Sequence, residues 1–217
     1  EIVEQNRVKT RSSNKTTDSS GRTAGQKKCY KYAMKEIRNQ VCKYKKASDR
    51  IAATAKLLSL SYGANNEQNR FTKPTKWSQV KGAKPTDLFK KAYDRYRPSH
   101  WSHRYSPKYG NVVRTGASCD VFVAVVLRAS GYEKTTKGFS YSKITSRLKN
   151  TKQWKKVGKA KAGDICDKPG KHIQISLGSG RSASAQSGNH SGHSRFGHIQ
   201  HSGCGTSKYT NYRPIAD

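Results

Sequence analysis

Hydrophobic residues recur at helical spacing through much of the chain. Apolar side chains every three to four residues predict a helix from Tyr30 to about Tyr44 and a second around Ile51 to Leu60. Thr86 can cap a third helix. The most apolar stretch, Val121 to Ala129, predicts a buried helix that ends at Gly131.

A period of two replaces the helical period at His172. Ile173, Ile175 and Leu177 alternate with polar residues, which predicts a strand with one packed face and one polar face that is able to line a cleft. Because helices come first and strands follow, the pattern favours an α+β fold over a doubly wound sheet.

The segment after this strand predicts a hairpin. If Gly178 to Gly180 forms a three-residue loop, Ala183 and Ala185 fall on the same face as the isoleucines. This register sets three pairs of residues opposite each other: Leu177 and Arg181, Gln174 and Ser184, and His172 and Gln186.

Other segments lack a regular apolar period. Residues 1–28 are rich in small polar and basic residues, so we expect a basic, disordered arm. The polar stretch 63–84 and the aromatic, basic stretch from Tyr96 to Tyr109 predict loops. The chain is thereby divided into the arm at 1–28, a helical region at 29–109 and a core at 110–217.

The charge narrows the range of partners. The 217 residues include 44 Lys and Arg against 13 Asp and Glu, a net charge of +31. Such a surplus favours polyanions, namely nucleic acid, anionic membrane or anionic cell-wall polymer. No run approaches the roughly 20 apolar residues of a membrane span, so we expect a soluble protein. The first residue, Glu1, fits the removal of an upstream signal peptide.

Five cysteines add a constraint. An odd number in a secreted chain predicts two disulfides and one free thiol, whereas a cytosolic chain would keep all five reduced. On one straight helix, Cys29 and Cys42 would lie about 20 Å apart, too far to bond. Either the helix is broken between them or each pairs elsewhere.

One cysteine lies where a nucleophile is expected. Cys119 directly precedes the buried helix, whose macrodipole lowers a thiol pKa. His172, at the start of the strand, can take the thiol proton and return it to a leaving amine. Gln186 opposite, or Ser184 on the diagonal, can hydrogen-bond the imidazole ring and set its tautomer. The alternative is a small buried cysteine and an ordinary polar strand residue.

Four short segments carry a family resemblance over about Gly110 to Gly188. They are Ser118-Cys119-Asp120, Ala162-Gly163-Asp164-Ile165, His172 to Gly178, and Ala183-Ser184-Ala185. In this order they resemble the NlpC-type cell-wall cysteine peptidases of the papain-like thiol hydrolase superfamily. Members generally have Asp before the Cys and Ser-Gly after it, whereas here Asp120 follows and the Ser-Gly is absent.

The resemblance implies a papain-like fold, with N-terminal helices packed on a small antiparallel sheet. It also implies Cys119 as nucleophile, His172 as general base, and cleavage of peptide stems in peptidoglycan without a cofactor. Its third position falls on Ser184, whereas the hairpin register favours Gln186, and both are kept. If Cys119 stays free, the other four cysteines form two bridges, of which we favour Cys166 with Cys204.

The expected protein is therefore a secreted, cell-wall-associated monomer whose partners are peptidoglycan and anionic wall polymers. A related thiol amidase or acyltransferase fits the same residues. Nucleic-acid binding without catalysis is the alternative from a different class, supported by the charge and by the aromatic stretch from Tyr96 to Tyr109. The histidines from His190 to His201, with Cys204, have ligand types for zinc, but their spacing fits no common finger and no metal is expected.

Overall fold

The computed structural model describes residues 19–58, 87–96, 103–106, 112–115, 119–134, 141–186, 195–201, 204 and 208–215. The helices are α2 (Ala24–Tyr32), α3 (Arg38–Val41), α4 (Ala47–Leu58), α6 (Asp87–Tyr96), α7 (Cys119–Ala129) and α8 (Tyr141–Leu148). The strands are β1 (His103–Ser106), β2 (Val112–Thr115), β3 (Trp154–Val157), β4 (Ile165–Lys168), β5 (His172–Gly178), β6 (Arg181–Gln186), β7 (Arg195–His201) and β8 (Thr210–Pro214).

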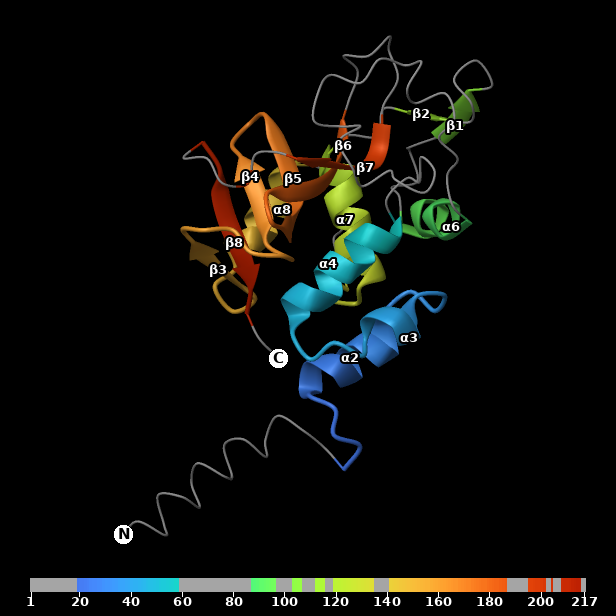
Figure 1. The fold of residues 1–217 in the computed structure, drawn as a ribbon, viewed down its shortest axis with the longest axis vertical. Coiled ribbons are helices and arrows are strands. Elements are labelled where there is room, and N and C mark those ends of the chain that lie inside the picture. Colours follow the sequence, from blue (N-terminus) through green and yellow to red (C-terminus); the bar gives the residue numbers. More distant parts are fainter. Residues whose placement is uncertain are drawn as a thin grey trace.

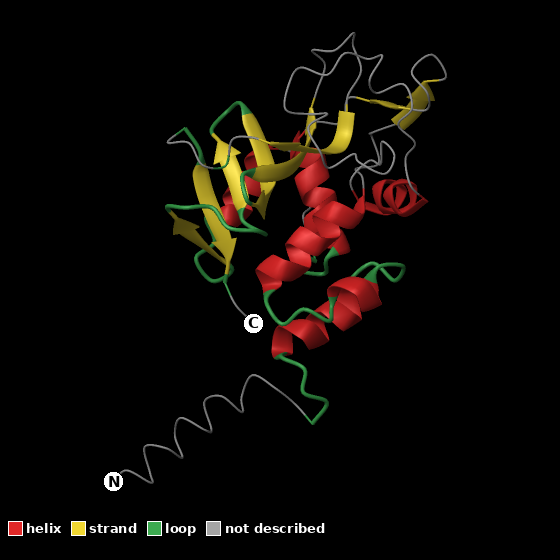
Figure 2. Ribbon diagram, viewed as in Figure 1, coloured by secondary structure: helices red, strands yellow, loops and turns green. Residues whose placement is uncertain are grey.

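One antiparallel sheet and a layer of helices make up the fold (Figures 1 and 2). The six-stranded sheet has the order β3-β8-β4-β5-β6-β7, and β1 and β2 form a separate antiparallel pair. The predicted α+β class is thus confirmed. Among the described helices, none has the length and apolar character needed to cross a bilayer.

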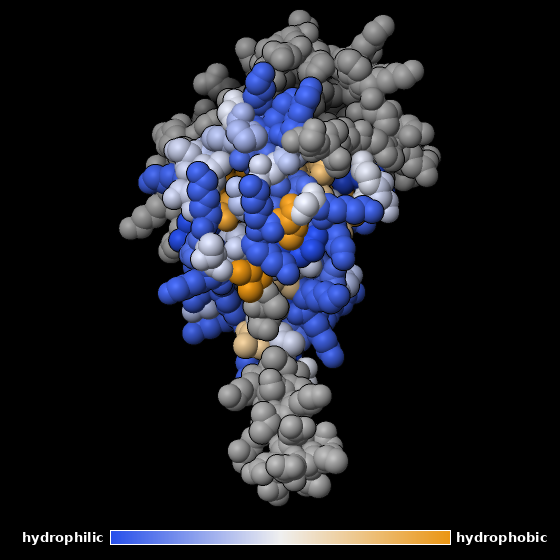
Figure 3. All heavy atoms as spheres, turned by 90° about the vertical axis from the view of Figure 1, so that its left-hand side faces the viewer, coloured by the Kyte–Doolittle hydropathy of each residue, from blue (hydrophilic) through white to orange (hydrophobic). Residues whose placement is uncertain are grey.

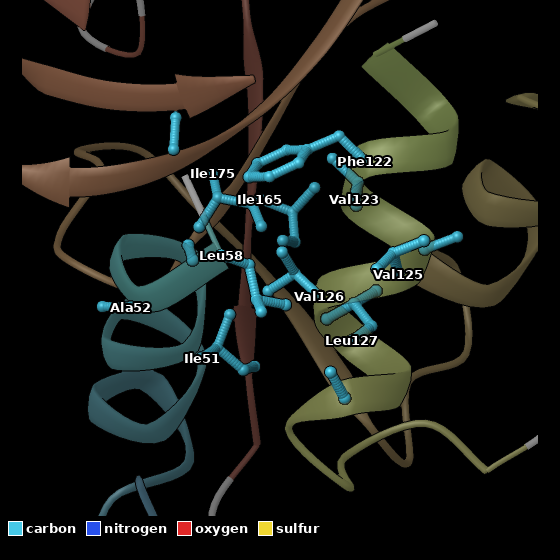
Figure 4. Close-up of a cluster of buried hydrophobic side chains, with 14 of the residues drawn as sticks. Ile51, Ala52, Leu58, Phe122, Val123, Val125, Val126, Leu127, Ile165 and Ile175 are labelled. Atoms are coloured by element: carbon cyan, nitrogen blue, oxygen red, sulfur yellow. The ribbon is translucent and has the colours of Figure 1, made fainter. Parts of the chain in front are cut away.

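Helix α7 forms the centre of the core. Its residues from Val121 to Leu127 are all buried, which is the pattern of a helix enclosed on every side. Figure 4 shows Phe122 and Val126 facing side chains of α4 and the sheet, among them Leu58, Ile165 and Ile175. The buried helix predicted at Val121 to Ala129 is confirmed, with two more residues at its start.

The helix predicted from Tyr30 to Tyr44 is broken. Helix α2 ends at Tyr32, Ala33 has an extended conformation, and α3 begins at Arg38. The Met34 main-chain N–H donates to the Ala129 carbonyl at the end of α7, over 2.7 Å. This tertiary bond takes Met34 out of the helical hydrogen-bond pattern. The turn brings Cys29 and Cys42 to a Cα separation of 5.5 Å, where they form a disulfide.

Two segments without a predicted period contain regular structure. Helix α2 starts at Ala24, inside the predicted arm at 1–28, because Thr23 and Gln26 form a reciprocal capping box. Strand β1 lies inside the predicted loop from Tyr96 to Tyr109 and pairs with β2. The helix predicted at Ile51 to Leu60 is confirmed as α4, which begins at Ala47. Residues 1–18, 59–86 and 107–111, including the segment 63–84 and Thr86, lie outside the described residues.

The hairpin follows the predicted register over part of its length. Ile175 pairs with Ala183, as predicted, but Gly178 rather than Leu177 pairs with Arg181. A bulge between Ser176 and Gly178 takes up the extra residue. The described pairing of β5 with β6 does not extend to the predicted pairs of Gln174 with Ser184 and His172 with Gln186.

The Gly163-Asp164 motif joins the helices to the sheet. Gly163 has a φ of +88°, and a Cβ there would lie 2.0 Å from the Ser48 carbonyl oxygen. The Asp164 carboxylate accepts hydrogen bonds from Arg213 on β8 and from the Lys161 main chain. These contacts align the turn before β4, and with it the neighbouring strand β5, which carries His172.

Candidate functional site

Cys119 is the first residue of α7 and is half-buried. Burial raises the pKa of its thiol above the ordinary value. A hydrogen bond from the main chain of Ile173 lowers that pKa, and the nearby Asp120 charge raises it. The expected net depression of the thiol pKa is therefore wrong, because the desolvation of a buried thiolate outweighs its position at the helix N-terminus.

The tertiary structure brings Cys119 to the strand that carries His172. The contact is at the main chain of Ile173, one residue after His172. The described β5–β6 pairing begins only at Ile175 and Ala183, so Ile173 lies beyond the paired stretch. There the Ser184 hydroxyl donates to the Ile173 carbonyl over 3.1 Å. The thiol and the hydroxyl thus both bind the main chain of Ile173.

His172 opens β5 and is half-buried. Burial lowers the pKa of its imidazole, a side-chain hydrogen bond with Gln174 raises it, and the charge of Lys168 lowers it. Its Nε2 atom is buried and has no hydrogen-bond partner among the described residues. The ring is therefore neutral at neutral pH and keeps one ring nitrogen unpartnered.

The polar face of β5 does not line a cleft. Gln174 and Ser176 are 0% and 3% exposed. The Gln174 side chain donates to Cys204 Sγ over 3.4 Å and accepts from the Ser182 hydroxyl over 3.1 Å. The prediction of a cleft along this face is therefore wrong at Gln174 and Ser176, and Cys204 of the disulfide with Cys166 lies against Gln174.

The residues expected to orient His172 have other surroundings. The hydrogen bond of Ser184 described above goes to the Ile173 carbonyl rather than to the ring. The main chain of Gln186 pairs with Arg195 on β7, and its side chain lies outside the described residues. Gln174 is the side chain that contacts the ring. The signal for Gln174 in the sequence is the alternation of the strand, which places it on the same face as His172; the hairpin register indicates only residues on the opposite strand.

A tyrosine and carboxylate pair lies near the thiol. The Tyr141 hydroxyl, at the start of α8, donates to Asp167 on β4 and accepts from the Gly170 main chain. Burial and the bond to Asp167 raise the pKa of Tyr141 to about 12, with a smaller effect from Cys119. Burial raises the pKa of Tyr209, and the charge of Cys119 raises it further. Neither tyrosine was indicated by a sequence motif.

The predicted disulfide between Cys166 and Cys204 is confirmed. Cys166 bonds Cys204, Cys29 bonds Cys42, and Cys119 is the free thiol. Since Cys204 is in a disulfide, it is not available as a thiolate ligand for zinc. His190 and His193, and the side chains of His198 and His201, lie outside the described residues. In the part of the chain that is described, no group of three or more His, Cys, Asp or Glu residues is arranged to hold a metal ion.

Comparisons of the chain with protein-family models, with curated proteins and with solved structures find no match.

Proposed function

We propose that this protein is a secreted thiol hydrolase of NlpC type that cuts peptide bonds in the stems of peptidoglycan. The observation that carries the proposal is the position of Cys119. It is the free cysteine, it starts a buried helix, and it contacts β5 one residue from His172. A helix that begins with a cysteine and packs on an antiparallel strand with a histidine is the arrangement expected of a papain-like enzyme.

The protonation states support a general-base mechanism. With the thiol pKa raised and the imidazole pKa lowered, both groups are neutral at neutral pH. The Cys119 proton passes to Nε2 of His172 as the sulfur attacks the substrate carbonyl and forms a thioester through a tetrahedral intermediate. The C–N bond breaks, and His172 gives the proton to the leaving amine. Water, deprotonated by the same nitrogen, then hydrolyses the thioester and restores the thiol.

The disulfides and the charge support the location and the substrate. Two disulfides are compatible with an extracellular protein. A net charge of +31 favours attachment to anionic wall polymers. In this scheme, cleavage of the peptide bond needs no metal ion. Binding to anionic wall polymers needs no membrane.

The decisive experiment is digestion of purified peptidoglycan, with new free amines measured and the products identified by mass spectrometry. We expect wild-type protein to release amines, and Cys119→Ala and His172→Ala to lose at least about a thousandfold in rate. Lys171→Gln, a change at the exposed neighbour of His172, is the matched control and should keep full activity. Circular dichroism and thermal unfolding should show that all three variants fold.

Full activity in Cys119→Ala would overturn the mechanism. A chain that binds DNA tightly at high salt and leaves peptidoglycan intact would instead favour the nucleic-acid-binding alternative. Release of an amide or acyl group without cleavage of stem peptides would assign the site to a related thiol amidase or acyltransferase.

A further inference from the structure

Gln174 is held more firmly than a polar residue at a strand surface would be. It lies two residues after His172 on the same face of β5 and is 0% exposed. Its amide nitrogen donates to Cys204 Sγ over 3.4 Å, and its carbonyl oxygen accepts from the Ser182 hydroxyl over 3.1 Å. A buried amide with a partner at each end has a defined orientation, because rotating it would break both bonds.

The Gln174 side chain lies on the same face of β5 as the ring of His172, two residues away. The side-chain hydrogen bond with Gln174 raises the pKa of His172, which identifies Gln174 as the acceptor and a ring N–H as the donor. A carbonyl oxygen has two lone pairs, so it can serve Ser182 and His172 together. Nε2 has no partner among the described residues, which leaves Nδ1 as the ring nitrogen that can donate to Gln174.

We propose that Gln174 is the positioning residue of His172, and that the disulfide between Cys166 and Cys204 holds Gln174 in place. Acceptance of the Nδ1 proton by Gln174 leaves the lone pair on Nε2, where the general base needs it. The catalytic consequence rests on the proposed function, whereas the ring tautomer and its dependence on Gln174 do not.

The two disulfides therefore have different roles. The bond between Cys29 and Cys42 closes the turn between α2 and α3, and Figure 1 shows these two helices apart from β5. The bond between Cys166 and Cys204 joins β4 to Cys204 and contacts Gln174 directly. Loss of the second bond releases Cys204, a partner of Gln174, from β4, whereas loss of the first leaves both partners of Gln174 in place.

The test is ¹⁵N NMR of the His172 ring in the folded protein, which reports the tautomer without any substrate. We expect the wild type to carry its proton on Nδ1. Gln174→Leu should lose this preference and lower the pKa of His172 further, because the acceptor is removed while Lys168 on β4 remains. Gln174→Glu should keep the Nδ1 proton and raise the pKa. Cys166→Ala with Cys204→Ala removes both the bond and the acceptor of the Gln174 amide N–H and should shift the tautomer in the direction of Gln174→Leu, whereas Cys29→Ala with Cys42→Ala should not.

Activity on peptidoglycan provides the second measurement. We expect Gln174→Leu to lose about tenfold or more in kcat with little change in KM, and Gln174→Glu to restore part of the loss. A wild-type ring protonated on Nε2, or a tautomer unchanged in Gln174→Leu, would overturn the proposal. Because the wild-type spectrum alone can refute it, the test does not depend on a variant that folds. The expected spectra together with an inactive wild type would refute the proposed function and leave the role of Gln174 intact.

Discussion

Burial determines the charge states of individual residues at the candidate site. Cys119 starts a helix, where the macrodipole favours a thiolate, yet desolvation is the larger effect and its pKa is raised. Desolvation also lowers the pKa of His172. Both effects favour the neutral forms, so the site does not contain a preformed thiolate and imidazolium pair at neutral pH.

The pH dependence of activity follows from these directions. The base must be neutral, so kcat/KM should rise with pH through the lowered pKa of His172, at a midpoint below 6.5. The change in kcat/KM at alkaline pH, where the Cys119 thiol ionises, should have its midpoint above pH 9.0, because the thiol pKa is raised. The groups that face the pair are Lys168 and Gln174 at the ring, and Asp120, Tyr141 and Tyr209 at the thiol. A pH profile of peptide cleavage tests this, and an acid limb above pH 6.5 would contradict it.

Contacts between elements set the positions of the secondary structures around the site. The break between α2 and α3 depends on Ala129 at the end of α7, and the turn before β4 depends on the close approach of Ser48 to Gly163. The turn is also tied to β5, since the Gly163 N–H donates to the Ser176 carbonyl over 2.8 Å. A change at this glycine would therefore affect both α4 and the strand of His172.

Gly163→Ala should destabilise the protein by about 2 kcal/mol or more. The new Cβ would lie 2.0 Å from a main-chain oxygen that cannot move aside easily, and the φ of +88° is strained for alanine. Gly158→Ala is the matched control, because a Cβ there meets nothing within 4 Å, and we expect a change within about 0.5 kcal/mol. Urea unfolding measures both. Equal stability of the two variants would show that the close approach of Ser48 is not maintained in solution.

The whole molecule is dominated by its positive charge. The face shown in Figure 3 is mostly hydrophilic, with small separate hydrophobic spots. Two buried carboxylates form ion pairs with arginines: Asp164 with Arg213, and Glu133 with Arg147. Many lysines, Lys155, Lys156 and Lys171 among them, are exposed. The charge is therefore available to a polyanion over a wide surface.

Raising the salt concentration should weaken attachment of the protein to the cell wall more than it slows peptide cleavage. Exposed charges are screened over about 8 Å at physiological ionic strength, so raising salt should weaken binding to intact walls and activity on whole cells. Cleavage of a small soluble stem peptide at the Cys119 site should change little. Sedimentation of the protein with purified walls, and peptide cleavage, should be measured in parallel from low to high salt. Equal loss in both assays would show that the charge acts on catalysis rather than on attachment.

The sequence predicted those parts of the fold and site that depend on local patterns. Short periods in the sequence predict these elements: the apolar run gives α7, and alternation gives β5 and the register of Ala183 in β6. The same patterns indicate Cys119 and His172 as candidate site residues. The break after Tyr32 and the strand β1 had no such signal, since the first depends on Ala129 and the second on pairing with β2.

By itself, the sequence determined the α+β class, the buried helix behind Cys119, the strand of His172 and the charge that favours a polyanion. Only the tertiary structure decided that Gln174 and Ser176 on the polar face of that strand are buried, and that the Cys119 thiol meets the main chain of Ile173. The reason is physical. Periodicity shows which side chains share a face, but desolvation and hydrogen bonding depend on what covers that face, and here Cys204 covers it from thirty residues away.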